Sequence, residues 1–380
     1  MQDTGKKPGS AETRTLSGEG NVPGNEPDYT RLLNRSIRTL LTDVLPLVLT
    51  RPALALFAVR TLFWQNRAAH VRTKALKGGI RVPPVLIFSV TSRCNLSCTG
   101  CYMRARGNAA EPDLTDNELH SIVSQAVDLG VSFMVFAGGE PLLRKDAIFR
   151  ITDEFPQVVF AIFTNGLLVD ENTAEAFVYR KNIVPVISFE GGQDETDIRR
   201  GSGTYGHLTR ACSLLRKYGI FFGCSLTVTR SNCEGITGES FIREMLQKGA
   251  RLVTFVEYVP LEKGTEDLVL TRNQRADLLR CLNDYPRKFP ALFLGFPGDD
   301  APYGGCLSAG RGFLHISPGG DLEACPAAPY SDTNLKRVPF QDALRSEYLA
   351  RVRDEHGILT ESEGGCALWA NRSWTASLLK

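Results

Sequence analysis

Residues 85–102 read Val85-Leu-Ile-Phe-Ser-Val90-Thr-Ser-Arg-Cys94-Asn-Leu-Ser-Cys98-Thr-Gly-Cys101-Tyr102, and this stretch decides the fold of the 380-residue chain. Its first six residues form a short apolar run, which is typical of a strand buried on both faces. Three cysteines with C-x3-C-x2-C spacing follow directly. Active sites of parallel barrels form in the loops after the carboxyl ends of strands. We therefore expect a strand that delivers three thiols to the rim of a barrel.

The central region alternates apolar runs with helical patterns. After the first run, Thr115 and Glu118 form a capping box and Gly130 ends the helix. Six β–α units fit between residues 84 and 260, whereas a full eight-unit barrel needs about 250 residues. The sequence therefore predicts an α/β fold with a parallel sheet curled into a partial (β/α)6 TIM-like barrel. The predicted strands lie near Val85–Val90, Phe133–Ala137, Val158–Phe163, Ile183–Phe189, Phe221–Val228 and Leu252–Val259.

The N-terminal part differs from this core. Residues 1–28 are polar and rich in Gly, Pro, Glu and Ser, which predicts a disordered tail without a signal peptide and hence a cytoplasmic location. Residues 29–82 are predicted to form a helical prefix. This segment contains ten Lys or Arg residues and one acid, Asp43, so its net charge is +9. No uncharged run approaches the roughly 20 residues that span a bilayer. Two interpretations remain: an amphipathic helix peripheral to a membrane surface, or a prefix packed on the main domain.

The ten cysteines are too sparse for a disulfide scaffold, and their clustering suggests metal ligation. A structural zinc site wants four protein ligands, but the next cysteine after Cys101 is Cys212. Three thiolates would leave one iron of a cubane cluster open to another ligand. The alternatives are buried structural cysteines or a zinc knuckle.

The C-x3-C-x2-C motif followed by the aromatic Tyr102 resembles the signature of the radical S-adenosylmethionine (radical SAM) superfamily. The resemblance implies that Cys94, Cys98 and Cys101 hold a [4Fe–4S] cluster whose open iron chelates S-adenosylmethionine. It further implies reductive cleavage to a 5′-deoxyadenosyl radical that abstracts hydrogen from substrate. A flavodoxin- or ferredoxin-like protein is the reductant that such an enzyme is expected to use.

Other motifs extend this resemblance. Gly138-Gly-Glu-Pro141 is similar to the family's GGEP turn, Thr164-Asn165-Gly166 ends the third strand, and Ser188-Phe-Glu190-Gly191 stands where relatives usually show Ser-x-Asp-Gly. At His207 some relatives carry an arginine that faces the methionine carboxylate, so the partner of that carboxylate is open in this chain. The residues that the resemblance assigns to cosubstrate binding are Tyr102, Gly138, Gly139, Glu140, Pro141, Asn165, Ser188, Glu190 and His207.

A second set of cysteines lies near the C-terminus. Cys306-Leu-Ser-Ala-Gly310, Cys325-Pro326 and Gly364-Gly365-Cys366 resemble parts of the auxiliary-cluster extensions called SPASM or twitch domains. The dense C-x2-C-x5-C block of a full SPASM domain is absent. The resemblance implies a radical SAM core over residues 83–290 and a hairpin module over 291–380. That module holds either a second [4Fe–4S] cluster on these three cysteines or no cluster.

The remaining cysteines are predicted to be structural, with one exception. Cys212 and Cys281 lie on helical stripes, and Cys224 alternates with apolar residues of a strand. Cys233 follows the fifth strand on the expected active-site rim, which makes it a candidate hydrogen donor.

Three functional hypotheses follow. The first is an enzyme that modifies a peptide or protein in a maturation reaction, and the second an enzyme of cofactor or lipid biosynthesis acting on a small molecule. The third is a non-catalytic iron–sulfur or zinc-binding protein. The net charge of +2 gives no indication of a nucleic-acid partner.

Overall fold

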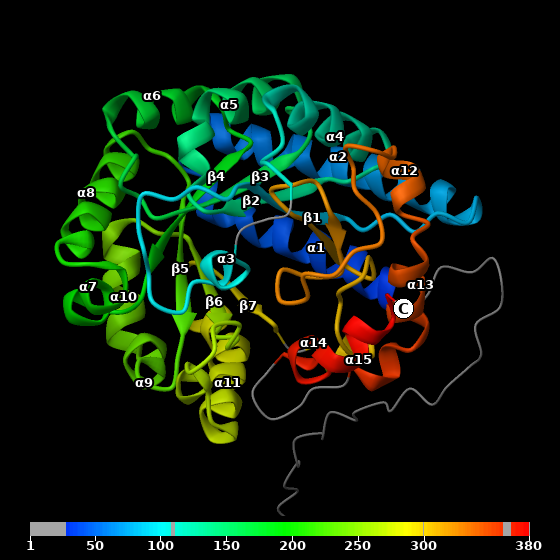
Figure 1. The fold of residues 1–380 in the computed structure, drawn as a ribbon. Helices are drawn as coiled ribbons and strands as arrows, with labels where there is room; N and C mark the ends of the chain where they lie inside the picture. Colours follow the sequence, from blue (N-terminus) through cyan, green and yellow to red (C-terminus); the bar gives the residue numbers. More distant parts are fainter. Residues whose placement is uncertain (1–27, 108–110, 299, 360–365, 380) are drawn as a thin grey trace, which may run out of the picture.

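A computed structural model describes residues 28–107, 111–298, 300–359 and 366–379. The predicted tail of residues 1–28 lies almost wholly outside the described residues. In the described part, nine strands form one sheet in the order β7-β6-β5-β4-β3-β2-β1-β8-β9 (Figure 1). The strands are β1 (Val85–Thr91), β2 (Phe133–Gly138), β3 (Val159–Thr164), β4 (Ile183–Phe189), β5 (Gly223–Val228), β6 (Leu252–Glu257), β7 (Leu292–Phe296), β8 (Phe313–Ile316) and β9 (Leu322–Glu323).

Helices follow most strands and cover the outer face of the curled sheet. The α-helices of the core are α3 (Tyr102–Ala105), α4 (Asp116–Asp128), α5 (Lys145–Glu154), α6 (Glu171–Tyr179), α7 (Gln193–Arg200), α8 (Thr204–Lys217), α9 (Cys233–Thr237), α10 (Glu239–Lys248) and α11 (Arg272–Lys288). Those of the C-terminal part are α12 (Phe340–Ala343), α13 (Glu347–Asp354), α14 (Ala367–Ala370) and α15 (Arg372–Ser377). Four 3-10 turns complete the structure, namely η1 (Pro141–Arg144), η2 (Glu266–Leu268), η3 (Ala301–Tyr303) and η4 (His356–Ile358).

The predicted partial barrel is confirmed. All six predicted strands are present, and β1 to β6 pair in parallel in sequence order. The sequence analysis missed β7, which pairs in parallel with β6 and extends the half-barrel. The predicted hairpin is present as β8 and β9, and β8 also pairs in parallel with β1. The second cysteine region therefore extends from the main sheet.

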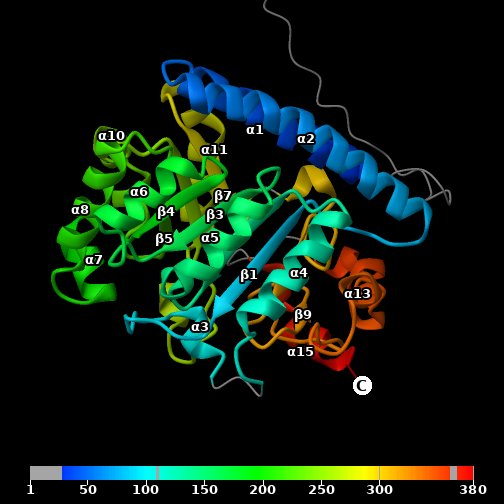
Figure 2. The ribbon, with the colours of Figure 1, turned by 90° about the horizontal axis from the view of Figure 1, so that it is seen from above.

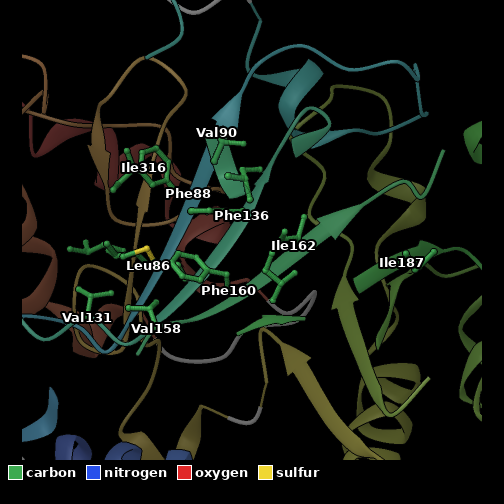
Figure 3. Close-up of a cluster of buried hydrophobic side chains, with 14 of the residues drawn as sticks. Leu86, Phe88, Val90, Val131, Phe136, Val158, Phe160, Ile162, Ile187 and Ile316 are labelled. Carbon is green, nitrogen blue, oxygen red and sulfur yellow. The ribbon is translucent and has the colours of Figure 1, made fainter. Parts of the chain in front are cut away.

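The core lies between the sheet and its outer helices. Leu86, Phe88 and Phe136 alternate with residues that point to the inner face, because successive side chains of a strand point to opposite faces. Figure 3 shows them packed with Phe160 of the neighbouring strand. The Phe88 and Phe136 ring centroids lie 6.2 Å apart, a spacing at which aromatic pairs contribute about 1 kcal/mol each. This core fixes the strands that carry the site.

The predicted helical prefix forms two antiparallel helices, α1 (Asp28–Val48) and α2 (Pro52–Lys77). Pro52 begins α2, where its missing N–H costs nothing. Apolar residues of α1 such as Leu40 and Val44 pack against the amino-terminal parts of the strands, and Arg72 of α2 donates a 2.6 Å hydrogen bond to the Gly130 carbonyl. The helix pair thus covers the amino ends of the strands. In Figure 2 the arrowhead of β1 points away from it, toward α3.

No described helix is both long enough and apolar enough to cross a membrane.

Candidate active site at the carboxyl ends of the strands

The C-x3-C-x2-C loop leaves β1 at the carboxyl edge of the sheet. Cys94 is exposed, whereas Cys98 and Cys101 are half-buried. Asp113 anchors the start of the loop: its carboxylate accepts hydrogen bonds from Thr91 Oγ1 at 2.6 Å and from the Ser92 N–H at 3.0 Å. Burial acts to raise the pKa of Asp113, but these hydrogen bonds outweigh burial and lower it. The anchor therefore persists at neutral pH.

The three thiols lie within electrostatic range of one another. Burial raises the pKa of Cys94, and the neighbouring Cys98 and Cys101 add to the effect. Burial also raises the pKa of Cys98, where the guanidinium groups of Arg200 and Arg199 act in the opposite direction. Two cations beside the loop thus favour thiolate, the form that binds a metal.

The GGEP turn after β2 packs directly on the cysteine loop. The Gly139 N–H donates to the Thr91 carbonyl at 2.7 Å, and the Glu140 N–H donates to the Arg93 carbonyl at 2.9 Å. A Cβ atom at Gly139 would lie only 1.9 Å from the Arg93 carbonyl oxygen. Glycine at this position therefore has a structural reason, the close approach of two backbones. The assignment of Gly138 and Gly139 to cosubstrate binding stays a prediction.

Glu140 fastens the GGEP turn to the end of β3. Its fully buried carboxylate accepts hydrogen bonds from Leu142 N–H at 3.0 Å, Thr164 Oγ1 at 2.7 Å and Asn165 N–H at 2.8 Å. Burial raises its pKa, and the hydrogen bonds from Asn165 and Leu142 oppose that shift. Pro141, the next residue, begins the 3-10 turn η1. Glu140 thus orders the rim rather than presenting a free carboxylate.

Asn165 connects this ordered rim to the cysteine loop. Its side-chain amide donates to Asn95 Oδ1 at 2.7 Å and lies 3.8 Å from Cys94 Sγ. Ser188, also predicted to bind the cosubstrate, is half-buried on β4 next to Ser225 of β5. The carboxyl ends of four neighbouring strands therefore bring most of the predicted residues to one edge.

Glu190, immediately after β4, has one oxygen in ion pairs and one oxygen unpaired. Oε1 binds the guanidinium groups of Arg199 and Arg200, the latter with its Nη2 at 2.5 Å. Oε2 is buried and has no hydrogen-bond partner among the described residues. A buried acceptor without a donor is costly. This oxygen thus has hydrogen-bonding capacity that no described residue uses.

The structure adds two cations to the predicted site, and the cosubstrate role of His207 stays a prediction. Arg199 and Arg200 of α7 approach both Glu190 and Cys98. The sequence analysis gave these arginines no role. His207 is exposed on the first turn of α8, and its imidazole has no hydrogen bond to the other site residues in the described part of the chain. The structure thus places arginines, rather than His207, beside the cysteine loop.

The cysteine loop and its neighbouring motifs match a known protein family. A family model described as "Radical SAM superfamily" matches residues 88–231, which include the cysteine loop, the GGEP turn and the Glu190 segment. Residues 88–231 are a radical SAM domain. Proteins with this domain form a superfamily of enzymes, and membership implies a [4Fe–4S] cluster and S-adenosylmethionine as cofactors.

Relatives of known activity align beyond the radical SAM domain. An AdoMet-dependent heme synthase of Methanosarcina barkeri is 26% identical over 321 residues, which cover 75% of this chain and 88% of the relative. The mycofactocin maturase MftC of Mycolicibacterium smegmatis is 28% identical over 308 residues, 76% of either chain. These relatives differ in the molecules that their names specify, so they do not fix a substrate for this chain.

Solved structures support the fold. Streptococcus suis SuiB bound to its precursor peptide SuiA matches with a TM-score of 0.61 and 19% identity, covering 82% of this chain and 75% of SuiB. The structure of anSMEcpe with bound AdoMet matches with a TM-score of 0.57 and 18% identity, covering 70% of this chain and 81% of anSMEcpe. At these identities the likeness is one of fold.

The residues of the radical SAM domain fit an iron–sulfur cluster by their chemistry. Three thiols on one loop, two arginines beside them and the unpaired Glu190 Oε2 make a donor set suited to a cluster with one open iron and a polar ligand next to it. Among the described residues, no three His, Cys, Asp or Glu side chains converge closely enough to hold a metal ion. The fit is thus one of donor type and loop position, not of preformed coordination geometry.

The second predicted cysteine group lies around the β8–β9 hairpin and α14. Cys306 precedes β8, Cys325 follows β9 and Cys366 precedes α14. Burial raises the pKa of Cys325 well above its usual value, and the other two thiols add to the rise. Burial likewise raises the pKa of Cys366 to about 12, with further contributions from Cys306 and from Glu257 at the end of β6. The three thiols therefore lie within electrostatic range of one another beside the β8–β9 hairpin.

Of the four other cysteines, Cys212 and Cys224 are buried, in line with their predicted structural role, and Cys281 is half-buried. Cys233 is buried on α9, where its thiol points to the Gln274 carbonyl of α11 at 3.9 Å, and burial raises its pKa to about 11. Its assignment as a hydrogen donor stays a prediction.

Proposed function

We propose that the chain is a radical SAM enzyme in which Cys94, Cys98 and Cys101 hold a [4Fe–4S] cluster and the surrounding rim binds S-adenosylmethionine. The observation that carries this proposal is the meeting of three coupled thiols, the GGEP turn and the unpaired Glu190 Oε2 at the carboxyl ends of β1 to β4. When bound, the cluster supplies the electron for reductive cleavage of S-adenosylmethionine to a 5′-deoxyadenosyl radical, which abstracts hydrogen from substrate.

The protein residues have supporting roles in this proposal. Glu140 keeps the GGEP turn rigid, so that the turn orients the methionine moiety. Glu190 Oε2 accepts a hydrogen bond from the cosubstrate, and Arg199 and Arg200 neutralise the negative charge of the thiolates. Ser188 and Asn165 offer further polar groups at the same edge. His207, exposed on α8, is the weakest of the predicted ligands.

The substrate proposed first is a peptide or protein in a maturation reaction. The support is likeness to the maturase MftC over 76% of the chain and to the fold of SuiB, which was solved with a precursor peptide. A small molecule of cofactor biosynthesis is the second candidate, because AdoMet-dependent heme synthases align over a similar length. We further propose a second [4Fe–4S] cluster on Cys306, Cys325 and Cys366 in a SPASM- or twitch-like module, because the neighbouring thiols contribute to the raised pKa values of Cys325 and Cys366.

Cleavage of S-adenosylmethionine separates the two enzyme hypotheses from a non-catalytic metal-binding protein. Anaerobically iron-reconstituted protein, reduced with dithionite, should convert S-adenosylmethionine to 5′-deoxyadenosine and methionine, and zinc-loaded protein should not. Each candidate substrate class is then added in turn, and the class that raises the rate of 5′-deoxyadenosine formation is the substrate class. Intact S-adenosylmethionine after incubation with the iron-loaded protein and both substrate classes would favour the non-catalytic alternative.

We also propose that α2 contacts an anionic phospholipid surface. Leu56, Val59 and Phe63 recur on one face of α2 and are 53%, 55% and 67% exposed, an unusual display of apolar side chains for a soluble surface. The helix contains Arg60, Arg67 and other bases but no acid, which complements anionic headgroups. Because α2 covers the amino ends of the strands, this contact would leave the cysteine loop facing away from the bilayer, toward a substrate that arrives from water.

Flotation with vesicles tests this contact. Full-length protein should float with phosphatidylcholine vesicles that contain phosphatidylserine and should not float with phosphatidylcholine alone. A Leu56/Val59/Phe63→Ser variant should lose flotation, whereas an Ile198→Ser control, which removes an exposed apolar side chain from α7 and not from the α2 surface, should keep it. Point variants are preferable to deleting the prefix, because α1 and α2 also pack on the core. Equal flotation of the triple variant and wild type would refute the contact.

A further inference from the structure

A line of hydrogen-bonded side chains runs through the protein interior from the first cysteine loop to the second cysteine region. Tyr102, the residue after Cys101, has its hydroxyl 3.2 Å from Ser89 Oγ. Ser89 Oγ lies 2.9 Å from His315 Nε2, and His315 Nδ1 lies 2.6 Å from Glu323 Oε2. Ser89 and His315 are fully buried, and Glu323 is 2% exposed. These groups come from β1, β8 and β9 and from the cysteine loop.

The line continues at both ends. Arg106 pairs with the other oxygen of Glu323 and donates to the Pro326 carbonyl at 3.3 Å. Pro326 is the residue directly after Cys325. At the opposite end, burial raises the pKa of Tyr102, while its hydrogen bonds with Ser89 and with the backbone of Gly138 in the GGEP turn oppose that rise. One connected set of polar groups therefore joins the GGEP turn and Tyr102 to the Cys325 segment.

The chemistry of these groups gives the line one direction. A carboxylate only accepts hydrogen bonds, so His315 Nδ1–H donates to Glu323. In a neutral imidazole Nε2 is then an acceptor, and the Ser89 hydroxyl donates to it. The Ser89 oxygen is left to accept from Tyr102. Each of these buried groups thus has a hydrogen-bond partner. The orientation of the Tyr102 ring therefore depends on His315, which lies more than 200 residues away in the sequence.

This arrangement exceeds what packing requires. An apolar pair would join β1 to β8 without the cost of burying a histidine, a carboxylate and a hydroxyl. We propose that His315 is a positioning residue of the S-adenosylmethionine site, which holds Tyr102 and the adjoining Cys101 and Gly138 backbone in the binding orientation. The inference rests on the proposed function. It adds that the C-terminal module helps to build the cosubstrate site of the radical SAM domain.

Binding of S-adenosylmethionine to the reduced, iron-reconstituted full-length protein tests this role. The electron paramagnetic resonance spectrum of the reduced cluster is recorded while S-adenosylmethionine is added, which gives both a Kd and a spectral signature. His315→Phe removes both ring nitrogens and should raise the Kd at least fivefold and alter the spectrum of the bound form. His315→Gln retains an acceptor for Ser89 and should bind more tightly than His315→Asn, which retains only the contact with Glu323.

Two further variants guard against a folding defect. Ser89→Ala breaks the line by removing one oxygen and should raise the Kd in the same direction as His315→Phe. Ser132→Ala removes a hydroxyl that is also buried but lies before β2, at the opposite end of the strands, and should bind as wild type does. An unchanged Kd and spectrum in both His315→Phe and Ser89→Ala would overturn the positioning role alone. Wild-type protein whose cluster spectrum does not respond to S-adenosylmethionine would overturn the proposed function and this inference together.

Discussion

The two cysteine groups differ in their surroundings. The Cys94 loop is partly open to solvent, and Arg199 and Arg200 lie beside it. In the second group burial raises the pKa of Cys325 well above its usual value and that of Cys366 to about 12. A cluster in the first group would meet a soluble cosubstrate and an electron donor, whereas one in the second would be shielded from them. The difference indicates that only the first group is built for turnover of a diffusing cofactor.

The sharpest way to separate the groups is to remove the second. A Cys306/Cys325/Cys366→Ala variant should lower the iron content after reconstitution from about eight to about four per chain. It should still form 5′-deoxyadenosine, because the first group is intact. Iron and sulfide analysis, together with chromatography of the products, measures both. An unchanged iron content would show that the second group holds no cluster.

The next largest effect is expected at Glu140. Glu140→Ala removes three hydrogen bonds to a buried carboxylate and frees the GGEP turn from the end of β3. A loss of about 3 kcal/mol, or roughly 100-fold in S-adenosylmethionine affinity, is expected. The second group should keep its iron. A Glu171→Ala control changes an exposed carboxylate at the start of α6 and should bind normally. Equal binding by both variants would contradict the role of the turn.

A smaller effect is expected at Glu190. Glu190→Gln keeps the shape of the side chain but removes the charge that pairs with Arg199 and Arg200. We expect S-adenosylmethionine affinity to fall about tenfold, in line with the loss of hydrogen bonds to a charged group. Iron content should remain near wild type, because the three cysteines are unchanged. Iron loss with unaltered affinity in the remaining holoprotein would instead mean that Glu190 supports the cysteine loop and does not bind the cosubstrate.

The smallest effect concerns the stability of the region between the two groups. Burial lowers the pKa of His315, with Arg106 acting in the same direction and Glu323 in the opposite one. Below about pH 6.5 the unfolded chain therefore binds a proton that the folded chain does not. Stability should fall as the pH drops below this value, by at most about 1.4 kcal/mol per pH unit from this group.

Thermal unfolding of the metal-free protein at pH 7.5 and pH 5.5 measures this pH dependence of the stability. His315→Gln carries no titrating group at this position, so its melting temperature should depend less on pH than that of wild type. Identical pH dependence in the two proteins would mean that His315 is protonated to the same extent before and after unfolding.

Local sequence patterns were sufficient for the parts of the molecule that local chemistry determines. The buried run Val85–Val90 predicted β1, and the Thr115–Glu118 pair predicted the start of α4, which has the expected capping box. The C-x3-C-x2-C spacing likewise placed the thiols on the loop after β1. In each case the signal lies within a few residues of the feature that it predicts.

Long-range features were missed because no local pattern encodes them. The run Leu292–Phe296 gives no sign that it pairs with β6, nor does Phe313–Ile316 that it pairs with β1. Arg199 reaches Glu190 and the cysteine loop only after α7 folds back over the strand ends. Nothing in the local sequence distinguishes His315 from other strand residues. It lies next to Ser89 only because β8 pairs with β1.

The most direct test of the account compares wild type with a Cys94/Cys98/Cys101→Ala variant. Both proteins are reconstituted anaerobically with iron and sulfide, reduced with dithionite and incubated with S-adenosylmethionine. We predict 5′-deoxyadenosine from wild type and none from the variant, which should retain about four irons in the second cysteine group. Formation of 5′-deoxyadenosine by the variant, or its absence from cluster-loaded wild type with every candidate substrate, would contradict the assignment of these three cysteines as the catalytic centre.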